Sequence, residues 1–242
     1  MIERENRGEV VVLRMAHGKV NALDLELLLA LIGTLDELAG QPLVLTGRGT
    51  TFSAGVDLRR IVAEPSGYAD EYLRALSRTF RLLFEYPGPA VAAVNGHAIA
   101  GGYVLAAACD HRVAADGHAR FGLSELAVGV PFPISAIEIV RHAVGTAAAH
   151  RLALSAELLE TTAAAAAGLL DEVVPADALL DTATARAATR ADRGLDAYRL
   201  TKRQLKRPAV ENIERADDSA VSTMWADPAA LHRIRDFVAN LG

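Results

Sequence analysis

The sequence predicts an α/β fold that ends in a helical section. Short apolar runs, typical of buried strands, alternate with helical patterns as far as about Val174. From Ala176 the pattern is helical almost to the end of the chain, with breaks expected at Pro208 and Pro228. We therefore expect a core over residues 1–190 and a C-terminal helical section over residues 191–242, with the boundary near Arg190.

The composition allows a sizeable core and excludes several classes of protein. The 242 residues are 51% hydrophobic and 23% charged, so disorder is not expected. A net charge of -5 disfavours general nucleic-acid binding. The single cysteine, Cys109, cannot form an intrachain disulfide, and we expect it to be a packing residue inside an apolar helix. The charged N-terminus and the lack of a long apolar stretch favour a cytoplasmic protein without a membrane span.

The N-terminal third contains a hairpin, a helix and a buried strand. Residues 1–4 and 10–15 are expected to pair across the Asn6-Arg7-Gly8 turn. Asp24 is a suitable N-cap for a helix that runs to about Ala39, where Gly40 stops it. The next strand is predicted over residues 43–45.

The remaining elements follow the same logic. An amphipathic helix is expected over residues 68–84, with Tyr72, Leu76 and Phe80 on one face. Further strands are expected over 89–94, 111–115 and 119–121, and extended chain over 169–174. Further helices are expected from 101 to about 110 and over 135–144, 146–154 and 162–168.

Two glycine-containing loops each follow a short apolar strand: residues 53–57 (Ser-Ala-Gly-Val-Asp) and residues 99–102 (Ile-Ala-Gly-Gly). Either loop alone is readily explained as a tight turn. Together they suggest two backbone N–H groups that converge on one oxygen, as in an oxyanion hole. The free N–H groups and the dipole at the helix that opens at Gly101 also suit a developing negative charge.

Other glycine motifs are excluded. In residues 47–52 a phenylalanine, Phe52, takes the place of the third glycine of a dinucleotide fingerprint. The chain has no P-loop sequence and no G-x-S-x-G nucleophile elbow, which weakens a serine-hydrolase interpretation. The seven histidines show no metal-ligand spacing, so we predict no metal site.

Three motifs occur in order at characteristic intervals: residues 52–58 (FSAGVDL), residues 92–96 (AAVNG) with 100–102 (AGG), and residues 121–125 (FGLSE). In this combination the chain resembles the crotonase superfamily of enoyl-CoA hydratases and isomerases over about its first three-quarters. The resemblance implies a crotonase-like spiral of βαβ units, assembled as a homotrimer or a dimer of trimers. It also implies an acyl-CoA substrate and no separate cofactor, since coenzyme A is part of that substrate.

The resemblance also assigns roles to residues. The thioester oxygen would accept hydrogen bonds from the backbone N–H groups of Val56 and Gly101, and Glu125 would be the catalytic acid. The remaining expected substrate contacts are Lys19, Ala22, Ser53, Ala54, Gly55, Asp57, Leu58, Ala100, Val104, Ser124 and Phe132. The CoA phosphates need positive charge, for which the candidates are Lys19, Arg59, Arg60 and the basic run over residues 202–207. Most of that run is as well explained as a solvated helix face.

One missing carboxylate indicates which reaction to expect. Hydratases of this superfamily hold a water between two glutamates, and here the first position is Val104 while the second is Glu125. Valine cannot orient or deprotonate water. A single acid suffices to move a proton from C2 to C4 of a 3-enoyl thioester, and the segment around Glu125 is similar to the Δ3,Δ2-enoyl-CoA isomerases. The sequence therefore favours an isomerase.

Three alternatives stay open. Glu125 can be explained without catalysis, as a helix-terminal acid capped by Ser124 and stabilised by the helix dipole. The chain can also be a hydratase, or a hydrolase or decarboxylase of the same superfamily. It can finally be a catalytically silent acyl-CoA binder or a subunit of a larger assembly. If Glu125 is catalytic, its apolar surroundings should raise its pKa toward the working range.

Overall fold

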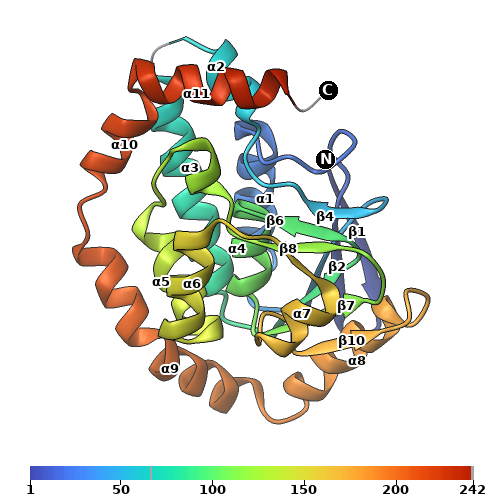
Figure 1. Ribbon diagram of the computed structural model, residues 1–242. Helices are drawn as coiled ribbons and strands as arrows, with labels where there is room; N and C mark the ends of the chain where they lie inside the picture. Colours follow the sequence, from blue (N-terminus) through green and yellow to red (C-terminus); the bar gives the residue numbers. More distant parts are fainter. Residues whose placement is uncertain (66, 241–242) are drawn as a thin grey trace.

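The larger of two sheets has six strands in the order β1-β2-β3-β5-β7-β10. The computed structural model describes residues 1–65 and 67–240. The strands are β1 (Ile2–Arg7), β2 (Val10–Met15), β3 (Leu43–Gly47), β5 (Ala90–Val94), β7 (His111–Ala115) and β10 (Glu172–Val174). β1 and β2 form the expected antiparallel hairpin, and all other neighbours are parallel. The α/β prediction is confirmed, with helices between the parallel strands (Figure 1).

Both faces of this sheet are covered. Every residue of β3 and β5 is buried, as expected for parallel strands between two layers. Leu43 and Leu45 face the main core, whereas Val44 belongs to a second cluster with the helix α8 (Leu179–Ala191). This alternation is the two-residue period of a strand, so adjacent side chains stabilise opposite layers.

The main core is built by helices from the whole chain. These are α1 (Leu25–Glu37), α2 (Leu58–Ala63), α3 (Tyr68–Phe84), α4 (Gly101–Ala108), α5 (Ile134–Val144), α6 (Thr146–Ser155), α7 (Thr161–Ala166), α9 (Leu195–Arg215), α10 (Ser219–Trp225) and α11 (Pro228–Ala239). In Figure 1 the helices α9 to α11 pass around the outside of α5 and α3, and α11 lies beside α2. The C-terminal section therefore packs on the core along much of its length, and the division at residue 190 stays a prediction. No helix in the described part of the chain combines the length and hydrophobicity of a membrane span.

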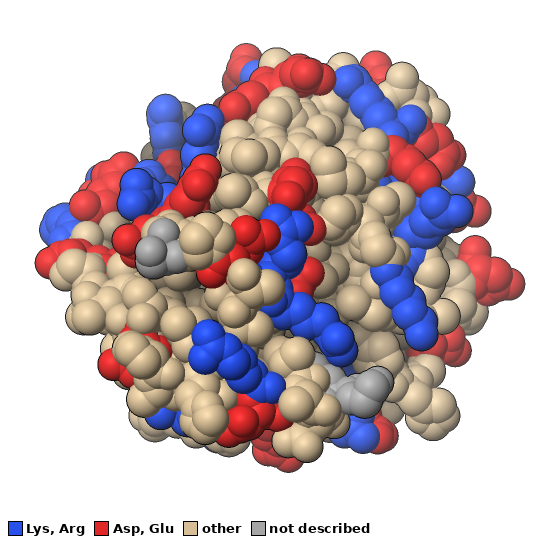
Figure 2. Space-filling view, turned by 90° about the horizontal axis from the view of Figure 1, so that it is seen from above, with Lys and Arg blue, Asp and Glu red and all other residues tan. Residues whose placement is uncertain are grey.

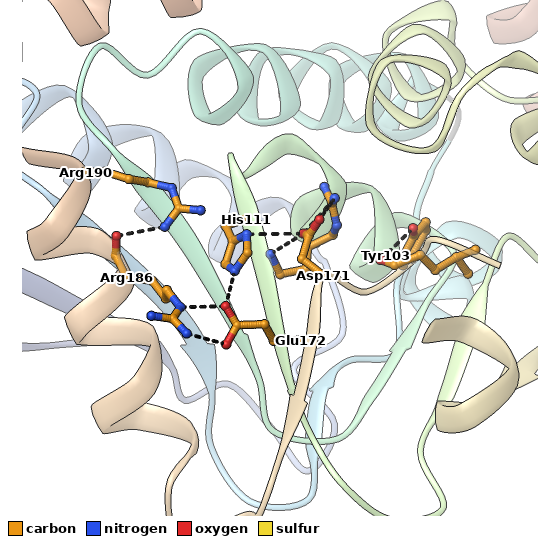
Figure 3. A network of polar contacts seen from close by, with 8 residues as sticks. Tyr103, His111, Asp171, Glu172, Arg186 and Arg190 are labelled. Atoms are coloured by element: carbon orange, nitrogen blue, oxygen red, sulfur yellow. Dashed lines mark hydrogen bonds and ion pairs between the residues drawn. The ribbon is translucent and has the colours of Figure 1, made fainter. Parts of the chain in front are cut away.

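An ion-pair network holds the edge strand β10 in place (Figure 3). The Nε and Nη2 atoms of Arg186 on α8 donate to the two carboxylate oxygens of Glu172 at 2.5 and 3.0 Å. His111 Nε2 lies 2.8 Å from the same carboxylate, and Arg112 Nη2 pairs with Asp171 at 2.7 Å. The network thus joins β7, β10 and α8 at one end of the sheet.

Two local expectations were wrong. Cys109 is not inside a helix but follows α4 as its C-cap; it is buried, and burial raises its pKa to about 12. Pro208 does not break the C-terminal pattern, because α9 runs through it. A proline removes one helical hydrogen bond, but buried contacts on both sides of it, at Lys206 and Ala209, hold the helix. Pro228 does start a new helix, with the Asp227 carboxylate accepting from the next turn.

The smaller sheet positions the loops that the sequence singled out. Its strands are β4 (Thr51–Ser53), β6 (His97–Ile99), β8 (Arg120–Gly122) and β9 (Leu159–Glu160), in that order. β4, β6 and β8 are parallel, so their carboxyl ends meet at one edge. The segments that follow them, residues 54–57, 100–101 and 123–125, therefore lie together.

Candidate active site

A cavity of 630 Å³ opens where these three segments meet. Nine of the expected catalytic and substrate-contact residues line it: Lys19, Ala22, Ala54, Val56, Asp57, Leu58, Ala100, Ser124 and Glu125. The other five do not: Ser53, Gly55, Gly101, Val104 and Phe132. The cavity brings together residues from several distant parts of the chain, which is the arrangement expected of a ligand site.

The two glycine loops are in direct contact. A Cβ atom placed on Gly55 would lie 2.6 Å from the carbonyl oxygen of Ile99 and 3.2 Å from the backbone nitrogen of Gly101. Gly55 also has a φ of +82°, which side-chain-bearing residues rarely adopt. Only glycine fits both conditions, so the sequence at this position allows the two loops to approach.

The N–H groups of Val56 and Gly101 have no backbone acceptor among the described residues. Val56 forms a parallel bridge with Leu23, in which Leu23 donates to the Gly55 carbonyl at 2.7 Å and Asp57 donates to the Leu23 carbonyl at 3.0 Å. This pattern uses the backbone groups on either side of Val56 and leaves its own N–H free. Gly101 is the first residue of α4, whose leading N–H groups have no partner within the helix. In the described residues neither N–H donates to another backbone group.

The residue before Gly101 carries backbone strain. Ala100 has a φ of +52°, in the left-handed region that favours glycine, and its N–H donates to the Gly122 carbonyl at 2.8 Å. Its side chain lines the cavity. Such strain persists only where neighbouring structure holds it, and it is concentrated at functional sites. Here it turns the chain from β6 into α4 and fixes the orientation of Gly101.

Glu125 is a buried carboxylate at the cavity wall. It is 7% exposed, and its Oε2 atom has no hydrogen-bond partner among the described residues. Burial raises its pKa to about 8, partly opposed by hydrogen bonds from backbone groups at Glu125 and Ser124. It begins the short 3-10 helix η1 (Glu125–Val128), and the side chain of Ser124 makes no capping hydrogen bond. The capping explanation is therefore wrong for Ser124, and the Glu125 carboxyl has the setting of an acid–base group.

Two polar residues of the first loop shape it through internal hydrogen bonds. The Asp57 carboxylate accepts from the N–H groups of Arg59 and Arg60 and so caps α2. The Ser53 hydroxyl donates to the Asn21 carbonyl at 2.7 Å and accepts from the Gly55 N–H at 3.2 Å. These groups hold the backbone around Val56 in place.

Comparison with known proteins agrees with this geometry. A family model described as enoyl-CoA hydratase/isomerase matches residues 5–235. The chain belongs to the enoyl-CoA hydratase/isomerase family. It is 39% identical to a putative enoyl-CoA hydratase of Thermus thermophilus over 85% of this chain and 83% of that one. It is 28% identical to the mitochondrial enoyl-CoA delta isomerase 1 of Rattus norvegicus over 88% and 76% of the two chains.

The fold likeness is strong as well. The human mitochondrial Δ3-Δ2-enoyl-CoA isomerase superposes with a TM-score of 0.93, covering 99% of this chain and 97% of that one at 25% identity. The resemblance drawn from the three motifs is thus confirmed, as is the crotonase-type fold. Members of the enoyl-CoA hydratase/isomerase family act on acyl-CoA thioesters.

Val104 and Phe132 occupy different places from those expected of contact residues. Val104 is completely buried one helical turn after Gly101, inside the core rather than on the cavity surface. Phe132 is partly buried and packs against the same core. No acid stands at the Val104 position, which belongs to the apolar core.

The basic candidates separate into two groups. Lys19 and Arg59 line the cavity, and Figure 2 shows Lys and Arg side chains on both sides of an uncharged area on the face that carries α2 and α11. Lys202 and Lys206 lie elsewhere: both are buried and pair with Asp110 at 2.7 and 2.8 Å. Lys202 and Lys206 therefore do not belong to a solvated helix face, and they do not line the cavity. Their ion pairs anchor α9 to the core.

Sequence reasoning missed several cavity residues. His17 lies 2.5 Å from the Asp24 carboxylate and lines the cavity beside Lys19. Trp225, Phe237 and Val238 come from the C-terminal helices and close another part of the wall. The charged residues Lys19 and Asp24, close to His17 in the sequence, offered some signal that His17 belongs to a polar site. No local pattern marked Trp225, since its place depends on how α10 packs.

Proposed function

We propose that this protein shifts the double bond of a 3-enoyl-CoA to C2. The ionised Glu125 carboxylate removes a proton from C2, and the thioester oxygen takes up negative charge as a dienolate. The N–H groups of Val56 and Gly101 donate to that oxygen. Glu125 then returns the proton at C4, so the double bond moves from C3–C4 to C2–C3 and no water is consumed.

The single observation that carries this proposal is the unpartnered Oε2 atom of Glu125 at the cavity wall. Among the described cavity residues, Asp57 is the other carboxylate, and its oxygen already accepts from Arg59 and Arg60. Because its Oδ1 atom ties the Asp57 side chain to the start of α2, we assign proton exchange with a ligand to Glu125. Its raised pKa, about 8, also suits a group that both takes and returns a proton near neutral pH.

The absence of an acid at position 104 favours isomerisation over hydration. Hydration by two carboxylates needs a second acid to hold and activate water, and Val104 cannot supply one. The family resemblance further supports a homotrimer or a dimer of trimers, acting without a cofactor apart from the CoA of the substrate.

Hydration is the second candidate. The relative that favours it is the Thermus thermophilus protein at 39% identity, which is named as a putative enoyl-CoA hydratase. Glu125 would then act as the lone base on water, and the N–H groups of Val56 and Gly101 would again stabilise the enolate. This reaction adds water across C2–C3 and leaves a hydroxyl group at C3.

The deciding experiment offers purified protein 3-hexenoyl-CoA and 2-hexenoyl-CoA separately. It separates the products by chromatography, detects the conjugated 2-enoyl thioester by its ultraviolet absorbance and detects added water by mass. Isomerisation without mass gain supports the proposal, and rapid addition of water to the 2-enoyl substrate supports the hydratase. Glu125→Gln should lower isomerisation roughly a hundredfold or more. Glu214→Gln, an exposed partner of Arg81, is the matched control and should be fully active. Undiminished isomerisation in Glu125→Gln would refute the mechanism, and binding without turnover would indicate a silent acyl-CoA binder.

A further inference from the structure

We propose that Trp225 closes the acyl end of the cavity and sets the longest acyl chain that the protein accepts. The inference rests on the proposed function in one respect, namely that the ligand is an acyl-CoA. It names a selectivity residue on α10, far in sequence from the catalytic loops.

The cavity has a charged part and an apolar part. His17, Lys19, Asp57 and Arg59 line it on one side, on the loop after β2 and at the start of α2. The apolar residues Val128, Val130 and Trp225 also line it, and Val128 and Val130 belong to the segment that follows Glu125. The charged phosphates of CoA are costly to move into apolar surroundings, whereas an acyl chain gains from burial there. The acyl chain is thus expected to run toward Val130 and Trp225.

Trp225 is a deeply buried member of the cavity wall. It is 1% exposed, whereas Phe237, which also lines the cavity, is 37% exposed. The cavity wall therefore includes both a solvent-facing part and a buried indole ring, and we place the inner end of the acyl site at the indole. Behind the ring lies Tyr72 of α3, with ring centroids 6.5 Å apart.

Helix α3 contacts both Trp225 and the proposed oxyanion donor Gly101. A Cβ atom on Gly101 would lie 3.4 Å from Phe80 and 3.9 Å from Leu76, so these side chains are behind the donor. Tyr72 lies one turn before Leu76 and two turns before Phe80, roughly 6 to 12 Å along the helix axis. Because Trp225 packs on Tyr72, the indole is displaced from Gly101 toward the start of α3. That separation leaves room for a short acyl chain.

The indole is held firmly. Its Nε1 donates to the Pro131 carbonyl at 2.9 Å, and its ring packs at 34° to Tyr72. Turning the ring away would break a buried hydrogen bond without a solvent partner. The wall is therefore fixed, and longer chains cannot displace it.

The test measures kcat/KM for 3-hexenoyl-, 3-octenoyl- and 3-dodecenoyl-CoA in the wild type and in Trp225→Leu. The wild type should prefer the shortest chain, and Trp225→Leu should raise the dodecenoyl-to-hexenoyl ratio by about tenfold or more. Trp225→Phe, which keeps an aromatic ring, should give a smaller shift in the same direction. Val130→Phe adds bulk beside the indole and should lower the ratio instead.

Phe84→Leu is the matched control, because Phe84 is fully buried in the core but does not line the cavity. It should change stability and leave the chain-length ratio unchanged. Calorimetric binding of hexanoyl- and dodecanoyl-CoA to the same variants separates this inference from the proposed function. The affinity ratio should shift even if no enoyl substrate is turned over. An unchanged ratio in every folded Trp225 variant, or a wild type that prefers dodecanoyl chains, would overturn the proposal.

Discussion

Gly55 and Gly101 are in contact across the two loops to which we assign the proposed oxyanion donors. A Cβ atom on Gly55 would lie 3.2 Å from the Gly101 nitrogen and 2.6 Å from the Ile99 carbonyl oxygen. The distance between the Val56 and Gly101 N–H groups therefore depends on a position that cannot carry a side chain. Four predictions follow from this contact and from three buried or paired charged groups.

The first concerns the loop contact. Gly55→Ala should destabilise the fold by about 1–3 kcal/mol, because it adds strain at a positive φ and a steric clash. It should also lower kcat by roughly a hundredfold by separating the two donors. Thermal unfolding and steady-state kinetics measure the two effects. Gly49→Ala is the control, since Gly49 has a similar φ of +78° with no atom within 4 Å. Equal losses of activity in both variants would contradict the contact argument.

The second concerns the pH dependence of Glu125. A base must be ionised, so kcat/KM should rise with pH through an apparent pKa of about 8. The folded pKa lies above the ordinary value of 4.5, so the folded state binds the extra proton between those values. Glu125 therefore lowers stability as pH rises from about 4.5 to 8, by about 1.4 kcal/mol per pKa unit at most. Glu125→Gln should be more stable than the wild type at pH 9, as measured by urea unfolding, and a less stable variant would contradict this.

The third concerns the network in Figure 3. The hydrogen bond from Arg186 is the largest cause that lowers the Glu172 pKa to about 2. A lowered carboxylate pKa contributes stability above pH 4.5, and that contribution is lost as pH falls through about 2. Glu172→Gln should cost about 1 kcal/mol at pH 7 and almost nothing at pH 2. The exposed Glu160→Gln should have no comparable effect, and a loss that is independent of pH would exclude the ion pair as its cause.

The fourth concerns the charges under α9. The Asp110 carboxylate accepts hydrogen bonds from Lys202, Lys206 and Tyr198, and the lysines hold its pKa below the ordinary value despite burial. Asp110→Asn should cost about 3–5 kcal/mol, because it leaves two buried lysines without a counter-charge. Denaturant unfolding measures the loss. Arg207→Gln, an exposed change on the same helix, should cost less than about 0.5 kcal/mol. A small effect of Asp110→Asn would mean that α9 is held by its apolar contacts.

Much of the site could be predicted from the sequence, because its elements are local. The glycines of the two loops and the segment ending at Glu125 are short motifs whose geometry depends on a few neighbouring residues. Nine of the predicted residues line one cavity. Among the expectations that differed, those for Lys202 and Lys206 concern side chains whose charged partner, Asp110, comes from a distant part of the chain.

The sequence by itself determined the longer elements and the chemistry available to them, whereas the short strands β4 and β6 fell in stretches interpreted as loops. The spacing of Tyr72, Leu76 and Phe80 specified the α3 helix, which spans Tyr68–Phe84 as expected. Only the tertiary structure decided which elements meet. The parallel strands β4, β6 and β8 place their carboxyl ends at one edge, and the packing of α10 on α3 brings Trp225 to the cavity. The physical reason is that periodicity and turn chemistry act over a few residues, whereas burial of the indole and pairing of charges depend on the whole packed core.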